Sequence, residues 1–173
     1  AHAGEVEIFE DPSAKGGAFA NMYEGTDTSY GKITNGKLHA VIDSGSVITF
    51  YHEDGRVLLK EHFRRLRDEE SMPLNIMGRE YSNGVGDNFR IVARFVARKG
   101  EKIFGMGQYQ QHELDLKGCM LELAQRNSQV SVPFYLSSIG YGFLWNNPGV
   151  GQVMFANNGT EWVTESGKEI DYL

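Results

Sequence analysis

Short apolar runs separated by glycine-rich gaps recur along most of the chain, and this pattern constrains the fold more than any other feature. The clearest run is Phe89–Arg98, in which alternate residues from Phe89 to Ala97 are apolar and share one face, while Arg90, Arg94 and Arg98 take the other. A period of two residues is that of a β-strand. Glycine occurs 21 times and falls in nearly every gap, and no amphipathic helix separates the runs. The spacing predicts an all-β fold, an antiparallel β-sandwich.

The Asp54-Gly55 pair between two apolar runs is a typical hairpin signal, because glycine supplies the positive φ of a tight turn. Residues 11–36, rich in small and polar residues, are expected to form a loop excursion or an irregular hairpin. Further strands are expected at Lys37–Asp43, Val47–Tyr51, Arg56–Leu59, Lys102–Phe104, Val132–Ser137, Tyr141–Trp145, Gln152–Ala156 and Glu161–Thr164.

The segment Leu58–Glu70 departs from the strand pattern. Its apolar residues at 59, 63 and 66 have helical spacing, so it is either a short helix or a strand that runs into a charged loop. Periodicity alone does not decide between the two, and the sandwich is therefore expected to contain at most one short helix.

Charge and cysteine content limit the classes of partner. The formal net charge is -6, and the most basic stretch, Arg64–Arg67, is followed at once by three acids, so nucleic acid and anionic membranes are not expected partners. The single cysteine, Cys119, excludes an internal disulfide and fits a reduced, cytoplasmic location. No apolar run approaches the roughly 20 residues of a membrane span, and the first residues show no signal-peptide core. The sequon Asn158-Gly159-Thr160 carries little weight without a secretion signal.

No complete active site is visible, and neither a metal nor a cofactor is expected. The five histidines are scattered without metal-ligand spacing, and Cys119 has no recognisable histidine partner. Glu113 and Asp115 would share a face in a strand and could do acid–base work, but a solvated loop explains them better. The Gly105–Gly107 segment lacks the third glycine and the helix of a dinucleotide loop.

Three sequence blocks, in this order, carry a family resemblance: EKIFGMGQ at Glu101–Gln108, QRN at Gln125–Asn127, and VPFYLSSIGYGFLWNNP at Val132–Pro148. Together they resemble the N-terminal, galactose mutarotase-like β-sandwich module of glycoside hydrolase family 31, which contains α-glucosidases and α-xylosidases. The closing KEIDYL at Lys168–Leu173 is similar to the exit from that module.

The resemblance implies that residues 1–173 form a single module of a larger α-glycosidase, without its catalytic (β/α)8 barrel and its own first strands. The parent enzyme would hydrolyse α-glucosides or α-xylosides with retention, and its catalytic carboxylates would lie on the barrel, so this chain alone is expected to be inactive. Its implied partners are the barrel and, through the parent active site, carbohydrate. A homo-oligomer remains open, as do a stand-alone carbohydrate-binding module and a purely structural docking module.

By the same resemblance, Arg126, Asn127 and Ser128 are the expected substrate-binding residues. Arg126 matches the family arginine, and Asn127 replaces the aspartate that often follows it, which removes a charge. The segment would help to wall the sugar site beyond the scissile bond; alternatively, Arg126 only contacts a carboxylate at the barrel interface. The nearby aromatic residues are expected to pack in a core or between domains and not to form a carbohydrate-stacking platform, with Tyr141, Phe143 and Trp145 on one face and Phe134 and Leu136 inward on the neighbouring strand.

Overall fold

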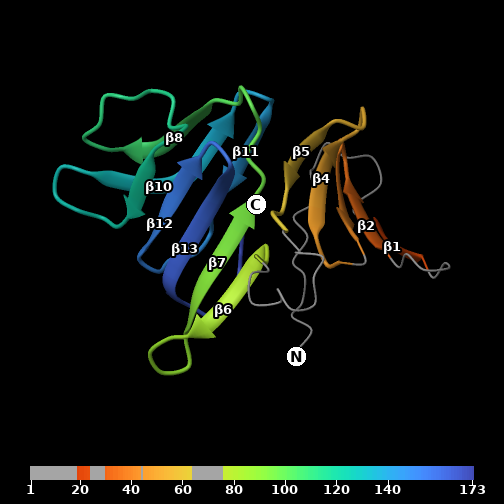
Figure 1. Ribbon diagram of the computed structural model, residues 1–173, viewed down its shortest axis with the longest axis horizontal. Helices are drawn as coiled ribbons and strands as arrows, with labels where there is room; N and C mark the ends of the chain where they lie inside the picture. The colour runs from red at the N-terminus through yellow and green to blue at the C-terminus, as the bar shows by residue number, and fades with distance from the viewer. Residues whose placement is uncertain (1–18, 24–29, 44, 64–75) are drawn as a thin grey trace. The chain divides into compact units, whose positions relative to one another are not determined.

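The computed structural model describes residues 19–23, 30–43, 45–63 and 76–173. Within these ranges the regular structure is entirely β, in three antiparallel sheets, which confirms the expected all-β fold (Figure 1). No helix in these ranges is long and apolar enough to cross a membrane. The chain divides into two compact units, Ala1–Lys60 and Glu61–Leu173. The assignment of residues 1–173 to a single module stays a prediction.

The first unit holds a five-stranded meander in which each strand pairs with the next. Its strands are β1 (Phe19–Tyr23), β2 (Tyr30–Asn35), β3 (Leu38–Ile42), β4 (Ile48–His52) and β5 (Val57–Lys60). β1 and β2 confirm the hairpin interpretation of residues 11–36 where the structure describes them. The Asp54-Gly55 hairpin between β4 and β5 is also confirmed: Gly55 has φ +83° and its N–H donates to the His52 carbonyl at 2.9 Å.

The ambiguous segment Leu58–Glu70 begins as a strand. Val57–Lys60 is β5, and Glu61 forms an isolated antiparallel bridge with Phe95. Residues 64–75 lie outside the described residues, so the helical alternative for that part stays open.

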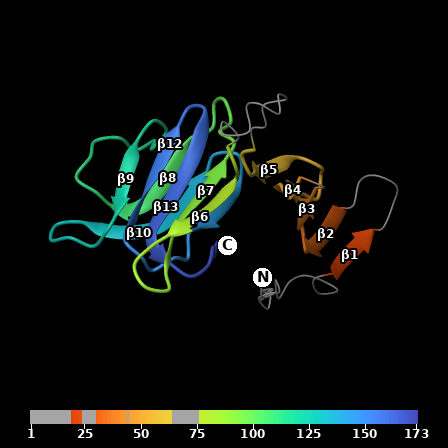
Figure 2. The ribbon, with the colours of Figure 1, turned by 60° about the horizontal axis from the view of Figure 1, so that its bottom comes forward.

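The second unit consists of two sheets, one of three strands in the order β11-β10-β8 and one of five in the order β6-β7-β13-β12-β9. Figure 2 shows β12, β13, β7 and β6 of the larger sheet side by side. The strands are β6 (Arg79–Asn83), β7 (Phe89–Phe95), β8 (Ile103–Gln108), β9 (Met120–Leu123), β10 (Val130–Ser137), β11 (Tyr141–Leu144), β12 (Gly151–Ala156) and β13 (Gly159–Gly167).

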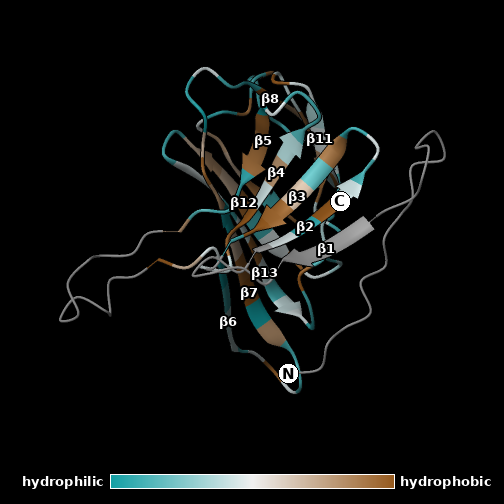
Figure 3. Cartoon of the chain, turned by 90° about the vertical axis from the view of Figure 1, so that its right-hand side faces the viewer, coloured by the Kyte–Doolittle hydropathy of each residue, from teal (hydrophilic) through white to brown (hydrophobic). Residues whose placement is uncertain are grey.

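Strand β7 contains the run that is clearest in the sequence, and its hydropathy changes between brown and teal along its length (Figure 3). Ile91, Ala93 and Phe95 are at most 1% exposed, as the alternation predicts. The strand ends at Phe95, three residues before the predicted end.

Aromatic side chains from the two sheets of the second unit form its core. Tyr135 of β10 packs on Phe155 of β12 with ring centroids 5.5 Å apart, and Phe143 of β11 packs on Trp162 of β13 at 5.3 Å. Trp145 stacks on Trp162 at 5.6 Å, and all these rings are at most 2% exposed. The two sheets therefore face each other across one apolar layer, as the sheets of a sandwich do.

The prediction that Phe134 and Leu136 point inward is wrong. Tyr135 is paired with Phe143 and shares its inward face, so its neighbours on β10 point outward and are 39% and 53% exposed. Tyrosine is tolerated inside because its hydroxyl lies 3.0 Å from that of Tyr141.

Candidate functional site

The three predicted substrate-binding residues lie together in the tight turn that connects β9 of the larger sheet with β10 of the smaller sheet. We call this connection the β9–β10 hairpin, although the two strands themselves do not pair with each other. Arg126 and Gln129 form an isolated antiparallel bridge, and the Gln129 N–H donates to the Arg126 carbonyl at 3.1 Å. Asn127 and Ser128 are the corner residues of this turn, and Ser128 adopts a left-handed φ of +72°. The side chains of Arg126, Asn127 and Ser128 are exposed. The hairpin thus presents a guanidinium, an amide and a hydroxyl at one point.

A side-chain amide closes the base of this hairpin. The Nε2 atom of Gln125 donates to the Ser131 carbonyl at 2.7 Å, and its Oε1 atom accepts from the Ser131 N–H at 3.1 Å. The Tyr109 hydroxyl donates to Ser131 Oγ at 2.7 Å and reaches the Glu122 carbonyl at 3.1 Å. Gln125 therefore holds the two arms together as a backbone bridge would, and this role of the residue is not evident from the sequence.

The glycines of the Gly105–Gly107 segment lie on β8 and allow a bulge in the neighbouring strand β10, which leads into the hairpin. Gly105, Met106 and Gly107 all have positive φ (+116°, +69° and +92°), and a Cβ on Gly107 would lie 2.1 Å from the Val130 carbonyl oxygen. Ser131 pairs with Gly107 but Tyr135 with Gly105, so β10 carries two extra residues in this interval. Such a bulge bends a strand and re-aims what lies beyond it, which here is the turn with Arg126.

Arg126 forms an ion pair with Glu122, four residues earlier on β9. The two side chains are 56% and 52% exposed, so solvent screens the pair and it contributes only about 0–1 kcal/mol to stability. An outside ligand could therefore recruit the guanidinium at little cost. The five N–H donors of arginine suit both hydroxyl groups and carboxylates.

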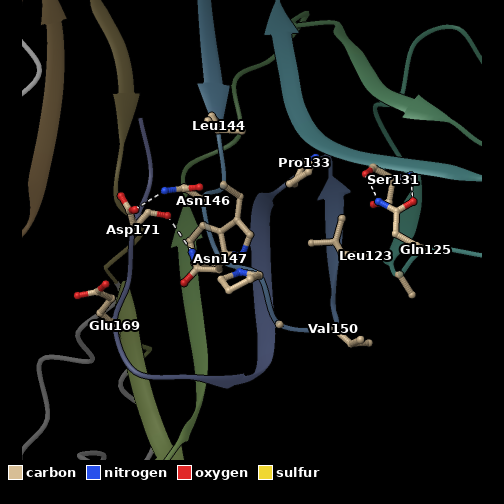
Figure 4. A pocket seen from close by; sticks show the side chains of 14 residues that line it. Leu123, Gln125, Ser131, Pro133, Leu144, Asn146, Asn147, Val150, Glu169 and Asp171 are labelled. Carbon is tan, nitrogen blue, oxygen red and sulfur yellow. Dashed lines mark hydrogen bonds between the residues drawn. The ribbon is translucent and has the colours of Figure 1, made fainter.

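A pocket of about 860 Å³ lies beside the base of the hairpin (Figure 4). The β11–β12 loop and the C-terminal segment supply most of its polar groups. It is lined by Leu123, Ala124, Gln125, Ser131, Pro133, Leu144, Trp145, Asn146, Asn147, Pro148, Gly149, Val150, Glu169 and Asp171.

Two asparagines tie the pocket together through Asp171. Asn146 Nδ2 donates to Asp171 Oδ2 at 2.5 Å, and Asn147 Nδ2 donates to the Asp171 carbonyl at 2.8 Å (Figure 4). These bonds use the amide donors, so the carboxylates of Glu169 and Asp171 and the two amide oxygens make the polar lining rich in acceptors. This pocket was not predicted from the sequence, because Asn146 and Asp171 are 25 residues apart in the chain.

The Glu113–Asp115 pair serves the fold of its loop. Asp115 Oδ1 accepts the backbone N–H groups of Ile103 at 3.0 Å and Lys117 at 3.1 Å. The bond from Ile103 is the main reason why the pKa of Asp115 lies below its ordinary value. Glu113 is exposed, and the interpretation of this segment as a solvated loop agrees with the geometry.

Glu101, in the first sequence block, is buried at the centre of a hydrogen-bond network. Its Oε1 atom accepts from Ser137 Oγ at 2.5 Å and from the Tyr141 hydroxyl at 3.1 Å, and Lys117 Nζ lies 3.6 Å from Oε2. Burial raises the pKa of Tyr141 and of Tyr135 above its ordinary value. This network joins β10, β11 and the loop before β8. In the described ranges, no cluster of three or more histidine, cysteine or acidic residues could hold a metal ion.

Comparison with known proteins shows that the chain is homologous to part of the family 31 α-xylosidases and glucosidases. No family model matches it. It is 45% identical over 151 residues to an uncharacterized family 31 glucosidase, ORF2, of Pseudescherichia vulneris, covering 81% of this chain and 28% of that protein.

Two solved structures are similar to the chain. A GH31 α-xylosidase from a soil metagenome, complexed with xylose, has a TM-score of 0.78 and 42% identity over 88% of this chain and 24% of that one. A xylosidase from Aspergillus niger has a TM-score of 0.70 and 27% identity over 82% of this chain and 20% of that one. The chain therefore spans about a quarter of the length of these relatives.

Proposed function

We propose that this chain, which is homologous to family 31 α-xylosidases and glucosidases over most of its length, is a non-catalytic module of a larger retaining α-glycosidase. The module packs on a (β/α)8 catalytic barrel and extends its β9–β10 hairpin to the substrate site. The observation that carries this proposal is the tip of that hairpin, where Arg126 is exposed on a base locked by Gln125. The second and third sequence blocks meet at this hairpin, and the bulge opposite the first block aims it.

The catalytic carboxylates are proposed to lie outside this chain. Retaining glycosidases use two carboxyl groups about 5–5.5 Å apart, one as nucleophile and one as acid and base. Glu169 and Asp171 are the acids of the pocket, and Asp171 is already bound by Asn146, which holds the C-terminal segment in place. A clamp of this kind is suited to structure and not to proton transfer.

The decisive experiment measures hydrolysis by the 173-residue chain and by the full-length enzyme. The full-length enzyme should cleave nitrophenyl α-xyloside or α-glucoside and release the sugar with retained configuration, which NMR detects directly. The 173-residue chain should show no turnover above background. Turnover by this chain that disappears in Glu169→Gln or Asp171→Asn would overturn the non-catalytic assignment.

The pocket supports a second candidate function, carbohydrate binding by the chain alone. Its acceptors could take hydroxyl protons, and Pro133, Pro148 and Val150 supply apolar surface for the C–H face of a sugar. Titration of the isotope-labelled chain with xylose, glucose and short α-glucans should then shift resonances of Asn147 and Glu169. The Asn147→Ala variant should abolish those shifts, whereas shifts at Arg126 only, or none, would remove this candidate.

A further inference from the structure

Asparagines that precede a small residue are the most reactive amides of a protein. The backbone nitrogen of the next residue can attack Cγ of the asparagine, and a small side chain on that next residue leaves the approach open. Glycine permits the fastest reaction and serine a slower one. The chain holds four such pairs: Asn35-Gly36, Asn83-Gly84, Asn127-Ser128 and Asn158-Gly159. By sequence alone, the three Asn-Gly pairs should therefore react before Asn127.

Two of the Asn-Gly pairs are held at strand ends. Asn35 is the last residue of β2 and pairs with Leu38 of β3, so the sheet fixes its backbone torsions. Asn83 is the last residue of β6, and the Gly84 N–H after it donates to the Asn88 carbonyl at 2.9 Å. A nitrogen that donates a hydrogen bond is held away from the asparagine side chain, so these pairs are restrained.

The third Asn-Gly pair is held by the β12–β13 hairpin. Gly159 pairs with Ala156 across the two-residue turn that contains Asn158. The Phe155 N–H donates to the Cys119 carbonyl on the β9 side, so the backbone groups of Ala156, the next residue, face Gly159. The nitrogen of Gly159 is therefore part of the ladder.

The Asn127-Ser128 pair lies outside every ladder. The bridge between Arg126 and Gln129 closes the turn, and Asn127 and Ser128 are its two corner residues. Both are exposed. Within the described part of the chain, neither the Ser128 N–H nor the Asn127 side-chain amide has a hydrogen-bond partner. The fold thus leaves both reacting groups of this pair unrestrained, and it restrains the three pairs that are intrinsically faster.

We propose that Asn127 is a deamidation site of the folded protein. The Ser128 backbone nitrogen attacks Cγ of Asn127, and the new N–Cγ bond expels the side-chain nitrogen as ammonia, which takes the amide proton with it. Water then opens the cyclic imide. Cleavage of the N–Cγ bond gives aspartate, and cleavage of the bond to the backbone carbonyl carbon gives isoaspartate. Water is the only co-reactant, and no oxidant or reductant is needed.

The product changes both the charge and the backbone of the turn. Aspartate replaces an amide, which donates and accepts, with an acceptor-only carboxylate next to Arg126, whose guanidinium already pairs with Glu122. Isoaspartate routes the backbone through the side chain and adds one carbon to the turn. The modification therefore alters the group to which the proposed function assigns the substrate contact, but its chemistry does not depend on that function.

Peptide mass spectrometry during incubation at mildly alkaline pH follows all four sites in one sample of the folded protein. The peptide with Asn127 should gain aspartate and isoaspartate severalfold faster than those with Asn35, Asn83 and Asn158. The same incubation in concentrated urea removes the sheets. There the order should reverse, because the intrinsic advantage of glycine is no longer opposed by the fold.

A variant checks the assigned nucleophile. Ser128→Gly removes the side chain that hinders the attacking nitrogen and suits the left-handed φ of +72°, so it should speed deamidation of Asn127 severalfold in the folded protein. Faster conversion of any Asn-Gly pair than of Asn127 in the folded protein would overturn the inference, and so would the same order of sites with and without urea. No glycosidase activity enters this readout, so its result is separate from that of the proposed function.

Discussion

Among the glycines of β8, the strand that pairs with β10 beside the hairpin, Gly107 should lose the most stability when it is replaced. Its φ of +92° and a Cβ position 2.1 Å from the Val130 carbonyl oxygen oppose any side chain. Gly118 provides a matched control, because its φ of +91° is nearly the same but a Cβ there would meet nothing within 4 Å. The pair Gly107→Ala and Gly118→Ala therefore separates backbone strain from steric overlap.

Left-handed backbone costs an L-residue about 1–2 kcal/mol, so Gly118→Ala should lose about that much. In Gly107→Ala the methyl group would also lie about 0.9 Å inside the 3.0 Å that real contacts respect, and β8 and β10 must separate. Overpacking of this kind costs about 1–3 kcal/mol, which gives a total of about 2–5 kcal/mol. Urea unfolding, followed by the fluorescence of the buried Trp145 and Trp162, measures both losses. Equal losses in the two variants would refute the account of the bulge.

Three further predictions concern the network around the hairpin. Gln125→Ala leaves the buried Ser131 N–H without its partner and should cost about 1–3 kcal/mol in urea unfolding; an unchanged midpoint would contradict the clamp at the base of the hairpin. Tyr141→Phe removes a hydrogen bond to the Glu101 carboxylate and should cost about 1.5–3 kcal/mol in the same assay, and a neutral result would contradict a stabilising role for this bond. The pKa of Asp115 is lowered in the folded state, so its ionised carboxylate stabilises the fold above pH 3.8. This contribution is lost as the pH falls through the folded pKa. Asp115→Asn should therefore be less stable than the wild type at pH 6, and the difference should shrink in acid; a gap that stays constant with pH would contradict this.

Strand positions follow from the sequence where a strand has a regular alternation and a clear turn. The β4–β5 hairpin with Gly55 and the strand β7 were predicted in this way. The short strands β6 and β9 were not predicted, because four or five residues of mixed polarity show no period. The inward face of β10 was predicted wrongly, because apolar side chains normally point inward. In the structure the inward hydroxyls of Tyr135 and Ser137 have hydrogen-bond partners, Tyr141 and Glu101, which the sequence does not show.

The candidate site was predicted in part. The family blocks located Arg126, Asn127 and Ser128, and the structure places them together at one turn, although their role in substrate binding stays a prediction. The pocket beside them was not predictable from spacing, because Asp171 reaches Asn146 only through the pairing of residues 171–173 along β11. The role of Gly107 also needed the structure, since only the position of β10 shows why a side chain is excluded there.

The central claim is that the turn with Arg126 reaches the substrate of a family 31 α-glycosidase. Arg126→Ala in the full-length enzyme tests it, with Arg90→Ala as control, because Arg90 also forms an exposed ion pair, with Glu165. Loss of an exposed arginine should change stability by no more than about 0.5 kcal/mol in either variant, which Tm checks.

The measurement is kcat/KM on a series of α-xylosides and α-glucosides that differ only in the leaving group. A charge-assisted hydrogen bond of about 1.5–3 kcal/mol corresponds to a fall of roughly 10- to 150-fold when it is lost from the transition state. We predict such a fall for Arg126→Ala, with a size that depends on the leaving-group sugar, and no change for Arg90→Ala. Unchanged kinetics in Arg126→Ala, or a loss shared equally by Arg90→Ala, would contradict the claim.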